Sequence, residues 1–216
     1  MSLIPKKLIQ ISREKPDEKH LELIKKYFPG WNYQHFNDND IINYFKKTKI
    51  DKLPDCEKKF YEIEKDGPSA WKTDFFRYYY LFLNGGVYLD SDAMTHCNLS
   101  KLLNKERLKG LFVKSNFFKN YNHIFNGFIC IEKRSPIMYN ALLHMYNTKN
   151  FNKIKNYQIF CESLLKILMF YDISNILILQ EKIKKGDGNR SSTITYNGQK
   201  VITHYFMDKI IPDTHV

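Results

Sequence analysis

The sequence predicts an α/β fold in which helices flank a mostly parallel central sheet and a hairpin follows near the C-terminus. Three observations predict it. Short apolar segments alternate with segments of helical periodicity along the first half of the chain, an order typical of parallel strands joined by helices. A double glycine near the middle separates the longest helical segment from another apolar strand. Near the end, Asn197-Gly198 joins two strand-like segments as a hairpin turn would.

The N-terminal part begins with two strands and two helices in alternation. Apolar and alternating segments predict strands at residues 7–12 and 31–36. Between them, apolar side chains at helical spacing predict a helix over residues 16–28. A run of Asn and Asp after the second strand supplies the cap of another helix over residues 41–47.

The middle of the chain holds the longest predicted helix, residues 69–83, which Ser69 would cap. Gly85-Gly86 ends it, because glycine accepts the left-handed conformation that a helix end requires. A strand over residues 87–90 follows, and a glycine-rich loop is expected at 184–192. The remaining elements are strands at residues 124–131, 176–179, 193–196 and 200–204, and helices at 136–146 and 158–171.

Composition limits the class of protein. The 216 residues, 43% of them hydrophobic, predict a single domain over residues 1–216. The net charge of +11 indicates an anionic partner without selecting among nucleic acid, acidic lipid, acidic glycan and nucleotide diphosphate. The four scattered cysteines include no Cys-x-x-Cys pair, which disfavours a zinc knuckle and favours a reducing compartment. With no apolar run of about 20 residues and no signal-peptide core, we expect a cytoplasmic or membrane-peripheral location.

Two carboxylates after the strand 87–90 are the strongest candidates for a chemical site. Asp90 and Asp92 can point the same way, beyond the C-terminal end of a strand, where open α/β sheets bind ligands. Neighbouring carboxylates repel each other, and a divalent ion that bridges them to a diphosphate removes the repulsion. Asp-x-Asp alone is a weak motif that more often marks surface acids or a cap. On the preceding helix, Asp74 and Arg77 share one face, although a surface ion pair would explain them too.

Residues 72–92 as a whole resemble the signature of the sugar-binding DXD-motif glycosyltransferases. This family-32-like group includes the initiating-mannosyltransferase and capsular-polysaccharide types. The shared pattern is Ser-Asp, two residues, Arg, then Leu, Gly-Gly, an aromatic strand and Asp-x-Asp, and this chain has Thr73 in place of Ser. Residues 4–10, 28–33 and 126–128 are similar to further segments of the family, with Ile9 where His is usual.

The resemblance implies a GT-A-like fold, a UDP- or GDP-sugar donor, Mn²⁺ or Mg²⁺, a glycan or protein hydroxyl as acceptor, and retention of anomeric configuration. Carried over to this sequence, it implies that Asp90 and Asp92 bind the metal and, with Arg77, take part in catalysis. The implied donor-binding residues are Gln10, Asp74, Arg77, Asp90 and Asn126. Asn126 could equally be a strand-end residue that only makes hydrogen bonds.

The resemblance to GT-A enzymes, many of which take a third metal ligand from a C-terminal segment, implies such a ligand in this chain too. His204 follows an apolar run there, and imidazole suits Mn²⁺, so it is the first candidate, with His215 behind it. A lone histidine is nevertheless more often a structural or surface residue.

Two other functions stay open. One is a basic nucleic-acid-binding protein, but without a zinc, helix-turn-helix or RNP motif we expect no nucleic-acid partner. The other is a catalytically silent relative that binds sugar nucleotides, against which the intact acidic pair argues. The basic charge also suits peripheral contact with an anionic membrane.

Overall fold

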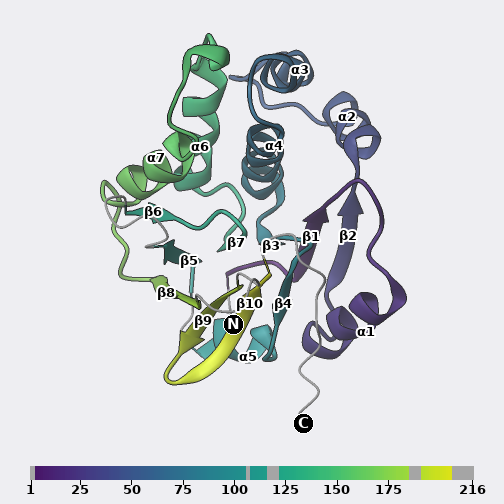
Figure 1. The fold of residues 1–216 in the computed structure, drawn as a ribbon, viewed down its shortest axis with the longest axis vertical. Helices are drawn as coiled ribbons and strands as arrows, with labels where there is room; N and C mark the ends of the chain where they lie inside the picture. The colour runs from purple at the N-terminus through teal and green to yellow at the C-terminus, as the bar shows by residue number, and fades with distance from the viewer. Residues whose placement is uncertain (1–2, 106–107, 116–121, 185–190, 206–216) are drawn as a thin grey trace.

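The computed structural model describes residues 3–105, 108–115, 122–184 and 191–205 (Figure 1). The helices are α1 (Glu18–Tyr27), α2 (Asp38–Lys47), α3 (Cys56–Asp66), α4 (Ser69–Asn84), α5 (Leu99–Lys105), α6 (Pro136–Asn147) and α7 (Ile159–Leu168), with a 3-10 turn at Phe151–Lys153. The strands are β1 (Lys7–Ile11), β2 (Asn32–Phe36), β3 (Gly86–Leu89), β4 (Ala93–Thr95), β5 (Gly110–Ser115), β6 (His123–Ile124), β7 (Phe128–Ile131), β8 (Ile176–Lys184), β9 (Ser191–Tyr196) and β10 (Gln199–His204).

These strands form one mixed sheet in the order β2-β1-β3-β7-β5-β8-β9-β10-β4, with β6 paired to β5. The pairs β2-β1, β1-β3 and β5-β8 are parallel, and the other neighbouring strands are antiparallel. The predicted α/β class and the central sheet flanked by helices are confirmed, but the sheet is mixed, with only three of the described strand pairs parallel. The parallel part contains β1 and β3, and it places the C-terminal end of β3 next to that of β1, as the predicted site requires.

Helices cover both faces of the sheet. Figure 1 shows α2, α3, α4, α6 and α7 on one side of the strands, with α1 and α5 on the other. Each side has its own hydrophobic core, and Ile9 of β1 belongs to the first while its neighbour Leu8 belongs to the second. Helix α4 is buried nearly all round, which explains why its sequence is so rich in aromatic residues. Among the described helices, none has both the length and the apolar character needed to cross a membrane.

Local sequence signals explain several element boundaries. Asn37 caps α2 in a reciprocal pair with Asp40, as the run of Asn and Asp predicts. The predicted hairpin is confirmed as β9 and β10, and Asn197 and Gly198 both have the positive φ, 49° and 77°, that a tight hairpin turn requires.

Other expectations need correction. Ser69 is the first residue of α4 and not its cap; Pro68 precedes the helix, and no side chain caps it. The single strand expected over residues 124–131 is two strands, β6 and β7, because the chain turns at Asn126 and Gly127. Strand β8 runs on to Lys184, and most of the expected glycine-rich loop, residues 185–190, lies outside the described residues. Sequence patterns do not predict helices α3 and α5 or strands β4 and β5, which the structure adds.

Candidate active site

The turn from α4 into β3 fixes the position of the acidic pair. Gly85 ends α4 with a φ of 65°, and Gly86 begins β3 with a φ of 106°. A Cβ atom at Gly86 would collide with the carbonyl of Lys7 on β1, so both the backbone conformation and the close approach of the strands require glycine. Strand β3 then runs buried between β1 and β7, and Asp90 follows its last residue. The predicted helix, double glycine, strand and acid therefore occur in that order.

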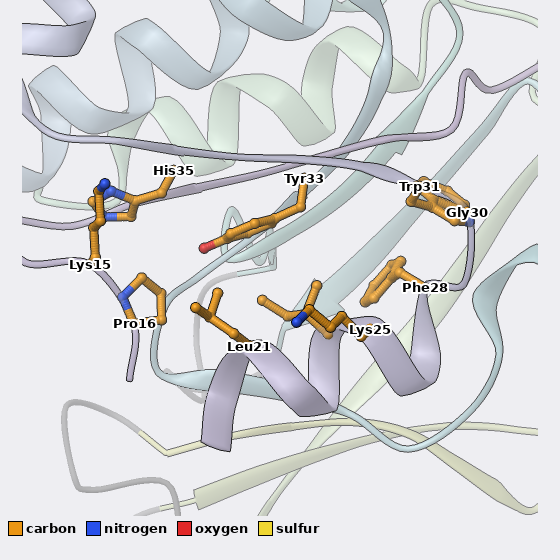
Figure 2. A pocket seen from close by; sticks show the side chains of 10 residues that line it. Lys15, Pro16, Leu21, Lys25, Phe28, Gly30, Trp31, Tyr33 and His35 are labelled. Atoms are coloured by element: carbon orange, nitrogen blue, oxygen red, sulfur yellow. The ribbon is translucent and has the colours of Figure 1, made fainter. Parts of the chain in front are cut away.

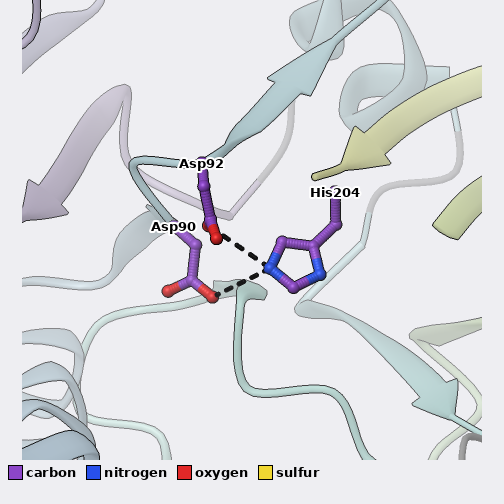
Figure 3. A group of neighbouring side chains, drawn as sticks. All are labelled: Asp90, Asp92 and His204. Carbon is purple, nitrogen blue, oxygen red and sulfur yellow. Dashed lines mark ion pairs between the residues drawn. The ribbon is translucent and has the colours of Figure 1, made fainter. Parts of the chain in front are cut away.

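Asp90, Asp92 and His204 converge, as Figure 3 shows. The Nε2 atom of His204 lies 3.3 Å from an oxygen of Asp92 and 3.9 Å from an oxygen of Asp90. One ligand atom from each residue lies within 4.8 Å of the other two. Strand β10 brings the histidine there, because His204 pairs with Ala93 directly after the acidic turn. The other candidate, His215, lies outside the described residues.

The charges of the cluster act on the imidazole. Burial alone would lower the pKa of His204, but the hydrogen bond with Asp92 and the charge of Asp90 outweigh it and raise the pKa above 6.5. Two carboxylates thus hold a cation between them when the imidazole is protonated. The arrangement is suited to a positively charged centre.

Arg77 is the centre of a buried hydrogen-bond network. Its Nη1 donates to the backbone carbonyl of Asn126, and its Nη2 donates to the hydroxyl of Tyr88 at 3.0 Å. The same Nη2 lies 3.4 Å from both Asp74 and Asp90. Burial opposes the charge of Arg77, but Tyr88, Asp74 and Asp90 outweigh it and raise its pKa. One guanidinium group therefore forms ion pairs with two carboxylates. A surface ion pair, the alternative explanation of Asp74 and Arg77, is wrong, because both side chains are buried.

Arg77 does not fully compensate the negative charge of the buried Asp74. Burial raises its pKa from 3.8 to about 6; the charge of Asp90 adds to the rise, while Arg77 and Asn126 oppose it. Asp90 differs, because it also accepts a hydrogen bond of 2.6 Å from Tyr88. The two carboxylates next to Arg77 therefore differ in their hydrogen-bond partners.

The turn between β6 and β7 lies next to Arg77 and Asp90. The side-chain oxygen of Asn126 accepts a hydrogen bond of 2.9 Å from Tyr78, and the side chain also helps to lower the pKa of Asp74. The backbone carbonyl of Gly127 accepts from the amide of Asp90 at 2.8 Å. A Cβ atom at Gly127 would collide with the ring of Phe125 and the carboxylate of Asp90, so any larger residue here would displace these side chains.

These residues surround one cavity of about 370 Å³. Five of the predicted site residues line it: Asp74, Arg77, Asp90, Asn126 and His204. The remaining lining includes residues that sequence reasoning missed, among them Glu181 of β8, Cys161 of α7 and Tyr157. Glu181 is buried, and its charge also raises the pKa of His204. No motif marks these residues, because they reach the cavity only through the pairing of distant strands and helices.

Gln10 occupies a different place from the other predicted residues. It is fully buried; its side-chain nitrogen donates to the carbonyl of Asp90 at 3.1 Å, and its oxygen bonds to Tyr33 and His20 at 3.1 Å and 3.0 Å. It does not line the cavity that contains Asp74 and Asp90. Gln10 therefore supports the backbone at Asp90, and its direct contact with a donor stays a prediction.

A second cavity lies between α1 and β2 (Figure 2). Its volume is about 590 Å³, and its lining is mostly apolar and aromatic, with Tyr33 and Trp31 on β2 and its approach and Leu21 on α1. It shares no lining residue with the cavity at Asp90. Tyr33 nevertheless connects it, through Gln10, to the backbone of Asp90.

Comparison with known proteins agrees with this geometry. Residues 14–109 match the family described as glycosyltransferase sugar-binding region containing DXD motif. An uncharacterized glycosyltransferase of Acanthamoeba polyphaga mimivirus is 31% identical over 116 residues, which are 53% of this chain and 43% of that protein. The structure is similar to that of PaToxG glycosyltransferase, with a TM-score of 0.51 and 17% identity, over 78% of this chain and 72% of that chain.

The fold is that of a GT-A-like α/β protein with an acidic pair at the C-terminal end of a central strand. The predicted resemblance to the DXD-motif glycosyltransferases is therefore confirmed over residues 14–109, and the viral relative supports it. The matched segment includes Asp74, Arg77, Asp90 and Asp92, whereas Gln10, Asn126 and His204 lie outside it. The chain spans less than half the length of the viral relative. The finer assignment to family 32 and the single-domain organisation stay predictions.

Proposed function

We propose that this protein is a hexosyltransferase that transfers a hexose from a UDP- or GDP-sugar to a hydroxyl of a glycan or protein. The observation that carries the proposal is the cavity in which Asp74 and Arg77 of α4 lie beside Asp90 and His204. Membership of family 32 and a role in polysaccharide synthesis belong to the same proposal. The DXD-motif family supports a glycosyl transfer, and the cavity supports a small polar donor.

Asp90, Asp92 and His204 would hold a divalent ion, Mn²⁺ or Mg²⁺. Ligand atoms around such an ion, with bonds of about 2.1 Å, lie about 3 Å apart in octahedral geometry. The separations of 3.3 Å and 3.9 Å need only small side-chain adjustments to reach this arrangement. Oxygen ligands with one imidazole suit Mn²⁺ in particular. When bound, the ion would neutralise the diphosphate and stabilise its charge as the leaving group.

The buried side chains next to this cluster would bind the donor sugar and orient it. The Nε atom of Arg77 is a buried donor without a hydrogen-bond partner among the described residues. Arg77 lines the cavity, so an oxygen of a donor there would satisfy this atom. Asp74, also on the lining, would accept hydrogen bonds from sugar hydroxyls. Asp90, Asp92 and Arg77 would together form the catalytic centre.

We further propose that the transfer retains the anomeric configuration. The diphosphate held at Asp90 and Asp92 would assist attack on the face from which it departs, and no carboxylate nucleophile is required for this route. Determining the anomeric configuration of the first product by NMR checks the proposal. An inverted product would contradict it.

A melting-temperature screen tests the donor and the metal together. We expect UDP or GDP, or one of their sugars, to raise the melting temperature only when Mn²⁺ or Mg²⁺ is present, because the carboxylates otherwise repel the diphosphate. Hydrolysis of the stabilising sugar nucleotide should show the same dependence on metal. Absence of metal-dependent binding to every donor would refute the proposal, and binding without hydrolysis or transfer would indicate a catalytically silent relative.

The location and partners of the whole protein are also proposals. The net charge of +11 supports peripheral contact with an anionic membrane or glycan. Sedimentation with anionic vesicles at low and high salt would test it, because a purely electrostatic contact is lost as the salt screens it.

A further inference from the structure

Tyr157 is an exposed aromatic side chain at the cavity of the candidate active site. Its residue surface is 52% exposed, yet it lines the same cavity as Asp74, Arg77 and Asp90. Burial of part of the ring raises the pKa of Tyr157, the charge of Asp74 adds to the rise, and Arg77 opposes it. Tyr157 therefore shares one cavity with the charged groups of the candidate active site.

Tyr157 is held in place from below by Trp71 of α4. The two rings stack with an interplanar angle of 27° and centroids 6.4 Å apart. The indole nitrogen of Trp71 donates to the backbone carbonyl of Tyr157 at 2.9 Å. Trp71 is itself buried among Phe151 and Phe160. An exposed ring on so rigid a base loses little conformational freedom when a ligand binds to it.

Gln158 adds a polar group to the same wall. It follows Tyr157 directly, lies at the start of α7 and lines the cavity. Its backbone amide donates to the side chain of Asn156 at 2.9 Å, which fixes the chain at this point. A flat aromatic face and a side-chain amide thus lie next to each other at one cavity.

We propose that Tyr157 and Gln158 form an acceptor subsite for a hexopyranoside, an inference that rests on the proposed function. One face of a pyranose carries C–H groups with partial positive charge, which the negative face of an aromatic ring attracts. The hydroxyls at the rim of the sugar would bond to the amide of Gln158. A flat ring beside one amide thus favours a carbohydrate acceptor, and binding of a peptide at the same place is an outcome of the test.

Saturation-transfer NMR on the full chain tests this subsite without relying on turnover. The probes are the methyl α- and β-glycosides of glucose, galactose and mannose, added with Mg²⁺ and with UDP or GDP. At least one hexoside should bind to the wild type, and Tyr157→Ala should weaken its affinity about fivefold to tenfold through loss of the stacking contact. Tyr157→Phe keeps the ring and should bind as the wild type does.

Tyr61→Ala is the matched control, because Tyr61 is also exposed but lies on α3 and does not line the cavity. It should leave hexoside binding unchanged. Unchanged binding in Tyr157→Ala, or no hexoside binding although the nucleotide binds, overturns the subsite. The subsite is also overturned if a Ser- or Thr-containing peptide binds to the wild type, hexosides do not, and Tyr157→Ala weakens the affinity for that peptide. Failure of the proposed function is distinct, since neither UDP nor GDP would then raise the melting temperature with metal.

Discussion

Two sides of the candidate active site hold their charged groups in different ways. On the α4–β3 side, formed by Asp74, Arg77 and Asp90, the groups are bonded to one another and to the buried hydroxyl of Tyr88. On the hairpin side, His204 reaches the acids from β10, and strand pairing with β4 and β9 places it there. The first side is a charged network within the protein core, and the second is one side chain on a strand.

This difference separates stability from binding. Removing a member of the α4–β3 network leaves another charge buried without compensation, so the fold itself should suffer. His204 carries no permanent charge, so its replacement should weaken the binding of a cation more than it weakens the fold. The predictions below test that separation.

Arg77→Met should have the largest effect on stability. It leaves Asp74 and Asp90 without their shared guanidinium, and breaking buried ion pairs in this way costs about 3–5 kcal/mol. Urea unfolding followed by circular dichroism measures the loss. The exposed Arg13, changed to Met, serves as the control and should stay within about 0.5 kcal/mol of the wild type. A loss in Arg77→Met no larger than in the control would mean that the network does not stabilise the fold.

Asp92→Asn should abolish metal-dependent donor binding while the fold is retained. Asp92 is only half-buried and lies 3.3 Å from His204, so we expect its replacement to affect cation binding more than the fold. We expect the affinity for Mn²⁺, measured by electron paramagnetic resonance, to fall about a hundredfold or more, because loss of an outer partner alone costs up to about that much. Asp51→Asn, at an exposed position between α2 and α3, should bind Mn²⁺ normally. Undiminished metal binding or activity in Asp92→Asn would exclude a metal role for this residue.

The same two sides differ in how far the sequence predicts them. Asp74, Arg77 and Asp90 lie within one short segment, in which helical spacing, a double glycine and an apolar strand indicate from local rules that these residues lie close together. Local rules of this kind also predict the hairpin turn at Asn197 and Gly198. The fold class and this part of the site therefore follow from the sequence.

Residues that arrive from distant elements are harder to predict. His204 could be proposed only because the family resemblance calls for a third ligand, and its contact with Asp92 depends on the pairing of β10 with β4. Glu181 and Tyr157 carry no local signal, since each reaches the cavity through long-range packing. The burial of Gln10 depends likewise on α1, whose His20 bonds to it from the far face of the sheet. Such contacts depend on sheet order, which local periodicity does not determine.

His204→Gln should reduce the affinity for Mn²⁺ about tenfold without a comparable loss of stability. Glutamine keeps a polar group near the acids but is a poorer ligand than imidazole. Electron paramagnetic resonance gives the affinity, and urea unfolding in the absence of metal gives the stability. His144→Gln is the control, because His144 lies on α6 and does not line this cavity. If His204→Gln bound Mn²⁺ as tightly as the control, the third ligand would have to come from elsewhere.

The smallest effect concerns the pH dependence that Asp74 gives to stability. Burial raises its pKa in the folded protein to about 6, whereas the unfolded chain should have the ordinary value of 3.8. The folded state therefore binds a proton that the unfolded state has released, so the stabilising contribution is complete below 3.8 and is lost as the pH rises through 6. Relative to Asp74→Asn, the wild type should gain about 1 kcal/mol of unfolding free energy between pH 7 and pH 5. Urea titrations of both proteins at several pH values measure this difference. The contributions of the titrating groups that both proteins share cancel in it. A relative gain on raising the pH would instead mean that Arg77 stabilises the charged form of Asp74 more than burial destabilises it.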